Sequence, residues 1–233
     1  MTVANPAPSS LPTSMRPRAR RTRALVLGGA LACAVGTLAV PAGSAGAVPP
    51  VAVAGVARLD DPAAAAASEA LVLLDRWVID GGSGDAAAYA VARNTLAAVI
   101  AARLELSAEA MSSAWAAADL EHQQALLAAL SQLGVPYRRN TSKPGQGFDC
   151  SGLTTYAWSQ AGFALPRNSG AQIRAAEPRD AETAQAGDLV QYPGHVMMWL
   201  GVDRAIVHAP QRGRAVEVDV LKRRSIRFGN PTE

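Results

Sequence analysis

The stretch Phe148-Asp149-Cys150-Ser151-Gly152 decides how the C-terminal half of this chain folds. A loop at residues 143–147, rich in glycine and proline, precedes it, and the apolar spacing that follows predicts a helix from Cys150 to about Ala161. Cys150 therefore lies at a helix N-terminus, where unpaired backbone N–H groups and the positive end of the helix dipole favour the thiolate. This position predicts a nucleophilic cysteine; the alternative is a small buried apolar residue.

A cysteine nucleophile needs a base, and the base needs a group that holds it in one tautomer. After the helix, apolar runs separated by glycine-containing turns predict an antiparallel meander of strands at residues 188–192, 195–200, 205–208 and 215–220. His195 begins the second of these strands and His208 ends the third. We expect both imidazoles on the face that packs against the Cys150 helix, in an α+β fold. Zinc bound by Cys150 and two histidines is the weaker interpretation, because no fourth ligand lies nearby.

An alanine-rich region at residues 63–130 predicts a helical extension that precedes the catalytic domain, itself assigned to residues 131–233. Capping residues and apolar spacing indicate helices at 63–79 and 85–103, and a third from Ser107 to about Leu133. His122 lies on the apolar stripe of the third helix. We interpret it as a helix-face residue without a chemical role.

The N-terminus has the layout of a secretory signal at residues 1–47. Arginines at 16–23 precede an uncharged stretch at 24–40, and small residues precede a cleavage site after Ala47. A linker at 48–62 follows. A membrane anchor is the alternative, although the stretch is shorter than the roughly 20 residues that span a bilayer; lipidation of Cys33 is another, and the export route stays open. Cleavage would leave Cys150 as one unpaired thiol in an oxidising compartment.

The net charge of +3 does not indicate a nucleic-acid partner, because residues 1–47 contribute five arginines and no acid. Residues 48–130 carry 4 basic and 10 acidic side chains, whereas residues 131–233 carry 13 and 9. We expect the helices to pack against the catalytic domain and to limit access to Cys150. The alternative is a spacer that holds the enzyme away from an anchor or partner. The protein partners are unknown.

Five motifs in order, spanning about residues 128–220, resemble the NlpC-type papain-like cysteine peptidases of bacterial cell walls. They are Leu133-Gly134-Val135-Pro136-Tyr137, then Phe148 to Leu153, then Leu165-Pro166-Arg167-Asn168-Ser169 with Gln172, then Gly187-Asp188-Leu189-Val190, and finally His195-Val196 with Ile206-Val207-His208-Ala209. The resemblance implies a papain-like domain with the nucleophile helix packed on a small antiparallel sheet.

The same resemblance implies roles for individual residues. Cys150 would be the nucleophile, His195 the base and His208 the residue that orients the base, with no metal or cofactor. Contacts to the amino end of a peptidoglycan stem peptide would come from Tyr137, Asp149 and Ser151; Asp149 could equally be a helix N-cap. A loop over the cleft would be braced by Arg167 and Ser169, for which a purely structural role is the alternative.

The implied function is a secreted or wall-associated bacterial endopeptidase that cleaves stem peptides between D-γ-glutamate and the diamino acid, with no membrane span after signal cleavage. Alternatives are an amidase or acyltransferase on the same scaffold, or a non-catalytic wall-binding module. Two departures from the family pattern concern specificity. Arg138-Arg139-Asn140 replaces an aromatic residue and paired glycines, and Met197 stands where a small residue is usual.

Overall fold

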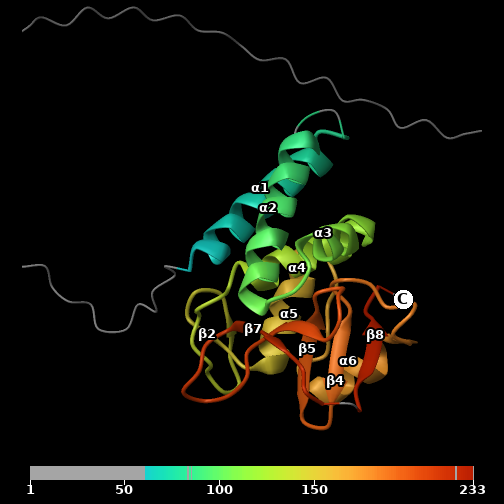
Figure 1. The fold of residues 1–233 in the computed structure, drawn as a ribbon. Coiled ribbons are helices and arrows are strands. Elements are labelled where there is room, and N and C mark those ends of the chain that lie inside the picture. The colour runs from blue at the N-terminus through green and yellow to red at the C-terminus, as the bar shows by residue number, and fades with distance from the viewer. Residues whose placement is uncertain (1–60, 83, 85, 224, 233) are drawn as a thin grey trace, which may run out of the picture. The chain divides into compact units, whose positions relative to one another are not determined.

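The computed structural model describes residues 61–82, 84, 86–223 and 225–232 (Figure 1). The expected signal, Cys33 and nearly all of the expected linker lie outside these residues. No helix within the described ranges combines the length and the apolar character that crossing a membrane requires. The architecture is α+β, as expected: four helices come first, and a helix packed on an antiparallel sheet follows.

The N-terminal helices are α1 (Pro62–Ile79), α2 (Ala86–Leu104), α3 (Ala108–Ala117) and α4 (Leu120–Leu130). At the start of α1, the side chain of Asp61 accepts a hydrogen bond from the backbone N–H of Ala63, while Pro62 occupies the first helical position. The Arg103 guanidinium, near the end of α2, donates to the same carboxylate through its two terminal nitrogens, each at 2.8 Å. This pair ties the beginning of α1 to the end of α2.

The expectation of one continuous helix after Ser107 was wrong, because the chain leaves the helical conformation at Ala118 and Asp119. The backbone N–H of Asp119 donates to the side-chain oxygen of Gln185, and the Gln185 amide donates back to the Asp119 carboxylate. Gln185 lies 66 residues away in the sequence. The break is thus stabilised by a tertiary contact that helix periodicity does not reveal.

A six-stranded antiparallel sheet has the order β3-β8-β4-β5-β6-β7. The four strands expected from the sequence form its consecutive part: β4 (Leu189–Tyr192), β5 (His195–Trp199), β6 (Ala205–His208) and β7 (Glu217–Val220). Not expected were β3 (Glu177–Arg179), β8 (Arg227–Asn230) and the short pair β1 (Ser142–Lys143) and β2 (Gly147–Phe148). β8 returns from the chain's end to pair with β4, so the sheet continues past the meander.

The nucleophile helix is α5 (Cys150–Gln160), and a shorter helix, α6 (Ser169–Ala175), follows it. Leu153 and Ala157 of α5 are fully buried and share the main core with Val196 and Met198 of β5. Met197 and Trp199 alternate with those residues and belong to a second cluster. α5 therefore covers one face of the sheet, while the second cluster occupies the other.

The helical extension shares one continuous core with the rest of the chain. The indole nitrogen of Trp115, on α3, donates to the backbone oxygen of Leu200 at 2.8 Å in a buried position. His122, on α4, is fully buried, and its Nε2 lies 3.0 Å from the Asp188 carboxylate. The expected packing of the helices on the catalytic part is thus confirmed, and His122 has a structural role at the contact. Whether this packing limits access to Cys150 stays a prediction.

We predict that Trp115→Ala lowers the free energy of unfolding by about 3–5 kcal/mol, because it removes a buried indole and leaves the Leu200 carbonyl without its donor. Urea denaturation measures this change. Ile79→Ala, at a position 81% exposed on α1, is the control and should change stability by no more than about 0.5 kcal/mol. A Trp115→Ala variant as stable as the wild type would show that α3 does not pack on the sheet in solution.

Candidate active site

Cys150 is the first residue of α5 and is partly exposed. Asp149 caps the helix: one carboxylate oxygen accepts the backbone N–H of Gly152 at 2.7 Å. The backbone oxygen of Thr141 accepts the N–H of Asp149 at 3.0 Å, so the chain around Thr141 crosses close to the helix start. A Cβ on Gly152 would lie 2.1 Å from that oxygen. Gly152 is therefore required for the loop to approach the nucleophile.

The second carboxylate oxygen of Asp149 is also occupied. It accepts the backbone N–H of Asn140 at 2.7 Å and one guanidinium nitrogen of Arg167 at 2.9 Å. The other terminal nitrogen of Arg167 lies 2.9 Å from the Ser151 hydroxyl. Arg167 thus connects the loop before α6 to the first turn of α5, as a bracing residue would.

Ser169 is placed differently from Arg167. It is the first residue of α6, and the cap of that helix is Asn168, whose side chain accepts the N–H of Ala171. The link from α6 to α5 is made by the buried Gln172, which donates to the Ser151 carbonyl and accepts from the Thr154 hydroxyl. Gln172, rather than Ser169, therefore connects this loop to the nucleophile helix.

Backbone pairing brings the nucleophile and the histidines to the same end of the sheet. Glu217 stands opposite His208 in the β6–β7 pair. Just before β7, Ala215 bridges to Pro136, and the next residue, Tyr137, bridges to Phe148, two residues before Cys150. The sequence expectation put both imidazoles on the α5 face. Met197 shares a strand face with His195, and Ile206 shares one with His208, and both lie in the second cluster, on the face away from α5. We therefore expect the imidazoles and Cys150 to meet around the end of the sheet.

His195 and His208 form a buried pair. Nε2 of His195 lies 2.9 Å from Nδ1 of His208, and the rings meet edge to face with centroids 5.2 Å apart. On the far side, Nε2 of His208 lies 3.3 Å from Oε1 of Glu217. The Arg214 guanidinium forms an ion pair with the same carboxylate oxygen. The tilted ring of Tyr192 covers His195, with centroids 5.3 Å apart.

This chain of contacts assigns the protons. Glu217 is held as a carboxylate by Arg214 and can only accept, so the proton of neutral His208 is on Nε2. Nδ1 of His208 is then an acceptor, and His195 must donate to it through Nε2. The lone pair of His195 is consequently on Nδ1. The contacts among His195, His208 and Glu217 do not use this nitrogen, so it is the atom that can act as a base.

Both imidazoles are neutral near pH 7. Burial lowers the pKa of His195 to about 4. Burial, and then the positive charges of His195 and Arg214, lower the pKa of His208 to about 3. Burial also raises the pKa of Glu217, against the opposing effect of Arg214. A neutral His195 can accept the proton of a thiol.

Tyr137 lies close to the nucleophile and its cap. Burial first, and then the negative charges of Cys150 and Asp149, raise the pKa of the Tyr137 hydroxyl, while Arg139 and Arg212 lower it. Of the expected site residues, the structure thus groups Tyr137, Cys150, Asp149, Ser151 and Arg167 around the start of α5, and joins the two histidines in a second group.

Sequence reasoning missed Glu217 and Arg214. The signal that could have found Glu217 is the hairpin register: a turn at residues 209–216 places it directly across from His208. Arg214 precedes β7 within that turn, and its charge lowers the pKa of the partly buried Glu217 carboxylate against the effect of burial.

Among the described residues, one group has ligand atoms spaced as for a metal ion: His208, Glu217 and Asp219, all within 4.8 Å of one another. Cys150 is not part of that group. Arg214 already binds the Glu217 oxygen and His208 already contacts it. His208 and Glu217 are therefore engaged in the histidine chain, and the zinc interpretation based on Cys150 receives no support from the geometry.

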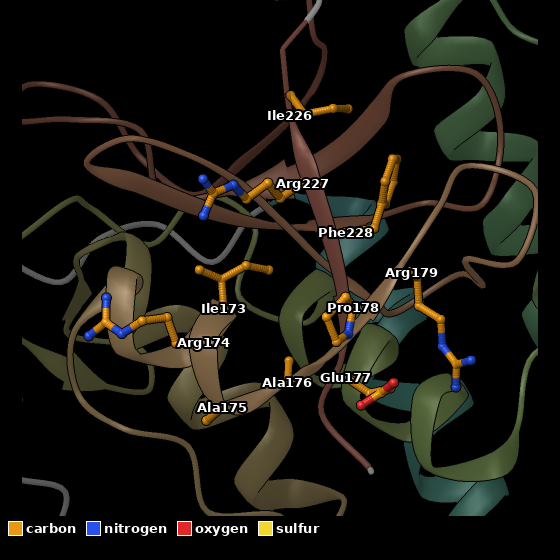
Figure 2. Close-up of a pocket in the computed structure, with 10 residues that line it drawn as sticks. All are labelled: Ile173, Arg174, Ala175, Ala176, Glu177, Pro178, Arg179, Ile226, Arg227 and Phe228. Carbon is orange, nitrogen blue, oxygen red and sulfur yellow. The ribbon is translucent and has the colours of Figure 1, made fainter.

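A pocket of about 560 Å³ lies between α6, β3 and β8. Figure 2 shows that basic and apolar side chains line it together with one acid, Glu177; among them are Arg174, Arg227 and Phe228. It contains neither Cys150 nor either histidine. The chemistry described above therefore belongs to the start of α5, not to this pocket.

Comparison with known proteins gives a family for the region that contains the site. Residues 134–227 match the model of the NlpC/P60 family. A protein of Mycobacterium tuberculosis named "probable endopeptidase" is 39% identical over 94 residues, which are 39% of this chain and 24% of that protein. The gamma-D-glutamyl-L-lysine dipeptidyl-peptidase of Bacillus cereus is 39% identical over 95 residues, or 37% of this chain and 28% of that protein.

A longer match includes part of the helical extension. A "probable endopeptidase" of Corynebacterium glutamicum is 35% identical over 139 residues, which are 58% of this chain and 59% of that protein. The chain thus spans less than two thirds of the length of each of these relatives. The region that matches the NlpC/P60 family model, residues 134–227, holds Cys150 and both histidines of the buried pair.

Proposed function

We propose that this chain is a secreted cysteine endopeptidase that hydrolyses peptidoglycan stem peptides at the bond between D-γ-glutamate and the diamino acid. One observation carries the proposal: His195, His208 and Glu217 form a chain of contacts that leaves the lone pair of His195 on Nδ1, in the same domain in which Cys150 begins α5. The name of the Bacillus cereus relative, a gamma-D-glutamyl-L-lysine dipeptidyl-peptidase, supports the choice of bond.

The reaction would be acyl transfer through a thioester. Nδ1 of His195 takes the proton of Cys150, and the sulfur attacks the scissile carbonyl carbon, while the backbone N–H of Cys150 helps to hold the oxyanion. The imidazolium then gives its proton to the leaving amine as the carbon–nitrogen bond breaks. Water, deprotonated by His195, hydrolyses the thioester and restores the thiol.

His208 and Glu217 would act through His195. When His195 becomes positively charged in its buried position, its Nε2 proton remains bound to His208, and the Glu217 carboxylate balances the charge through His208. Arg214 keeps that carboxylate ionised between turnovers. His208 and Glu217 would therefore position the base and set its tautomer without transferring a proton to the substrate.

Tyr137 is the best placed of the expected substrate contacts, because its hydroxyl lies near Cys150 and remains partly exposed. Asp149 and Ser151 are buried and already bonded to Arg167, so their main contribution would be to shape the pocket wall. Secretion rests on the sequence pattern of residues 1–47. N-terminal sequencing of the exported protein tests it, with Val48 expected as the first residue.

Cys150→Ala should abolish hydrolysis of purified peptidoglycan while leaving the unfolding midpoint near that of the wild type, because a half-exposed thiol contributes little packing. Mass spectrometry of the released muropeptides is the measurement, and new amino groups on the diamino acid are the expected product. Wild-type activity in the variant would refute the nucleophile assignment. Release of intact stem peptides from the sugar would instead indicate the amidase alternative.

His195→Ala should lower kcat by about 10²–10⁴-fold, because it removes the general base. His208→Ala should lower it less, by about 10–100-fold, because a positioning group is lost while the base remains. A crystal structure should also place Nδ1 of His195 within about 4 Å of the Cys150 sulfur. Equal losses, or a larger loss for His208→Ala, would mean that the two roles are exchanged.

Stability should fall in mild acid because of the two buried imidazoles. In the unfolded chain their pKa is about 6.5, whereas burial lowers it to about 4 and about 3 in the folded protein. The unfolded state therefore binds more protons below pH 6.5, and the free energy of unfolding should decline from pH 6.5 toward pH 4 and be level above. A His195→Gln/His208→Gln variant, followed by urea denaturation across this range, should lose most of the slope. An unchanged slope would contradict the buried neutral pair.

A further inference from the structure

The departure Arg138-Arg139-Asn140 lies beside the start of α5, next to a pocket of about 520 Å³. Three basic side chains line this pocket, Arg138, Lys143 and Arg167, and its remaining lining residues, 140–142 and Gln146, are neutral. No acidic side chain lines it. We refer to it as the cationic pocket.

The cationic pocket adjoins the nucleophile helix directly. The Ser142 hydroxyl donates to the Gly152 carbonyl at 2.7 Å, and Arg167 contacts Ser151 and Asp149 at the first turn of α5. The stem of Arg138 lies across the β1–β2 hairpin, since a Cβ on Gly147 would be 2.5–2.8 Å from its carbons. Packing against glycine thus holds Arg138 at the pocket wall.

Most of the positive charge here is uncompensated. Arg167 is paired with Asp149, but no salt bridge joins Arg138, Arg139, Lys143 or Arg212 to another residue in the described part of the chain. Arg139 and Arg212 both lower the pKa of the Tyr137 hydroxyl, whereas burial and the charges of Cys150 and Asp149 raise it. Arg138 and Lys143 therefore bring unpaired positive charge to the pocket wall, and Arg139 and Arg212 add to it near Tyr137.

We propose that the cationic pocket binds the α-carboxylate of the γ-linked glutamate, so that the enzyme selects stem peptides in which this carboxylate is free over those in which it is amidated. This inference rests on the proposed function. A γ-glutamyl bond leaves the α-carboxylate outside the peptide chain, on the same residue as the scissile carbonyl. The cationic pocket adjoins Asp149 and Ser151 through Arg167, on the side expected to face the amino end of the substrate.

A carboxamide has the size of a carboxylate but is neutral, and it presents N–H donors where guanidinium and ammonium groups need acceptors. Hydrogen bonds to a charged group correspond to a preference of about 10- to 100-fold. Because the cations are exposed, part of this preference should depend on ionic strength. The diamino acid lies on the other side of the scissile bond, so amidation of its side chain should have little effect.

The test compares two synthetic peptides, L-Ala-γ-D-Glu-diaminopimelate and its α-carboxamide. Calorimetry on the full chain with Cys150→Ala should show about 10-fold or tighter binding of the carboxylate peptide, with the difference shrinking as salt rises from about 0.05 to 0.5 M. Arg138→Gln/Lys143→Gln should remove most of the difference. Arg227→Gln, an exposed arginine in the separate pocket of Figure 2, is the matched control and should retain it.

Cleavage by the active chain then separates the two proposals. The proposed role of the cationic pocket would be overturned if the chain with Cys150→Ala alone bound both peptides equally, or if the preference survived Arg138→Gln/Lys143→Gln. Either result would count even if the active chain hydrolysed both peptides. Preferential binding of the carboxylate without hydrolysis of either peptide would leave the cationic pocket standing and refute the endopeptidase. Weaker binding of a peptide amidated only on the side chain of the diamino acid would show that the pocket binds that carboxylate, on the other side of the scissile bond, and would also overturn the proposal.

Discussion

The carboxylate of Asp149 is the group on which the arrangement of the site most depends. One oxygen caps α5 and so fixes where the helix starts, and with it the position of Cys150. The other oxygen holds the loop at Asn140 and the guanidinium of Arg167. Loss of this acceptor would remove the partner of donors from three segments at once, and the buried N–H of Gly152 alone would cost about 1–3 kcal/mol if left unpaired. The start of α5, the loop at Asn140 and the loop that carries Arg167 are thus stabilised by the same carboxylate.

The surroundings of the histidine pair differ electrostatically from those of the start of α5. At the start of α5 the helix dipole and nearby arginines favour negative charge, whereas burial keeps His195 and His208 neutral. A neutral imidazole can accept a proton at pH 7, as the base of the proposed reaction must. Glu217 lies at the far end of the pair, where its carboxylate contacts His208 and an Arg214 guanidinium.

The helical extension is part of the same core as the sheet. Trp115 donates to Leu200, just after β5, and His122 contacts Asp188, just before β4. Both side chains are buried, so water is excluded from the contact. A Cβ at Gly187 would meet the His122 backbone oxygen at 2.8 Å, so α4 approaches the turn before β4 closely. Helices packed this way support the catalytic sheet directly.

The sequence by itself determined the α+β class, the start of α5 at Cys150 and the strands from β4 to β7, because capping residues, glycine turns and apolar alternation act over a few neighbouring positions. Only the tertiary structure decided the break at Asp119, the edge strands β3 and β8, and the partnership of His208 with Glu217 and Arg214. Each of these depends on a partner brought near by pairing or packing between distant segments, as Gln185 is to Asp119. The cationic pocket combines both: its arginines were evident as a departure from the family pattern, but their common wall beside Cys150 exists only because β1, β2 and the loop before α6 converge on the first turn of α5.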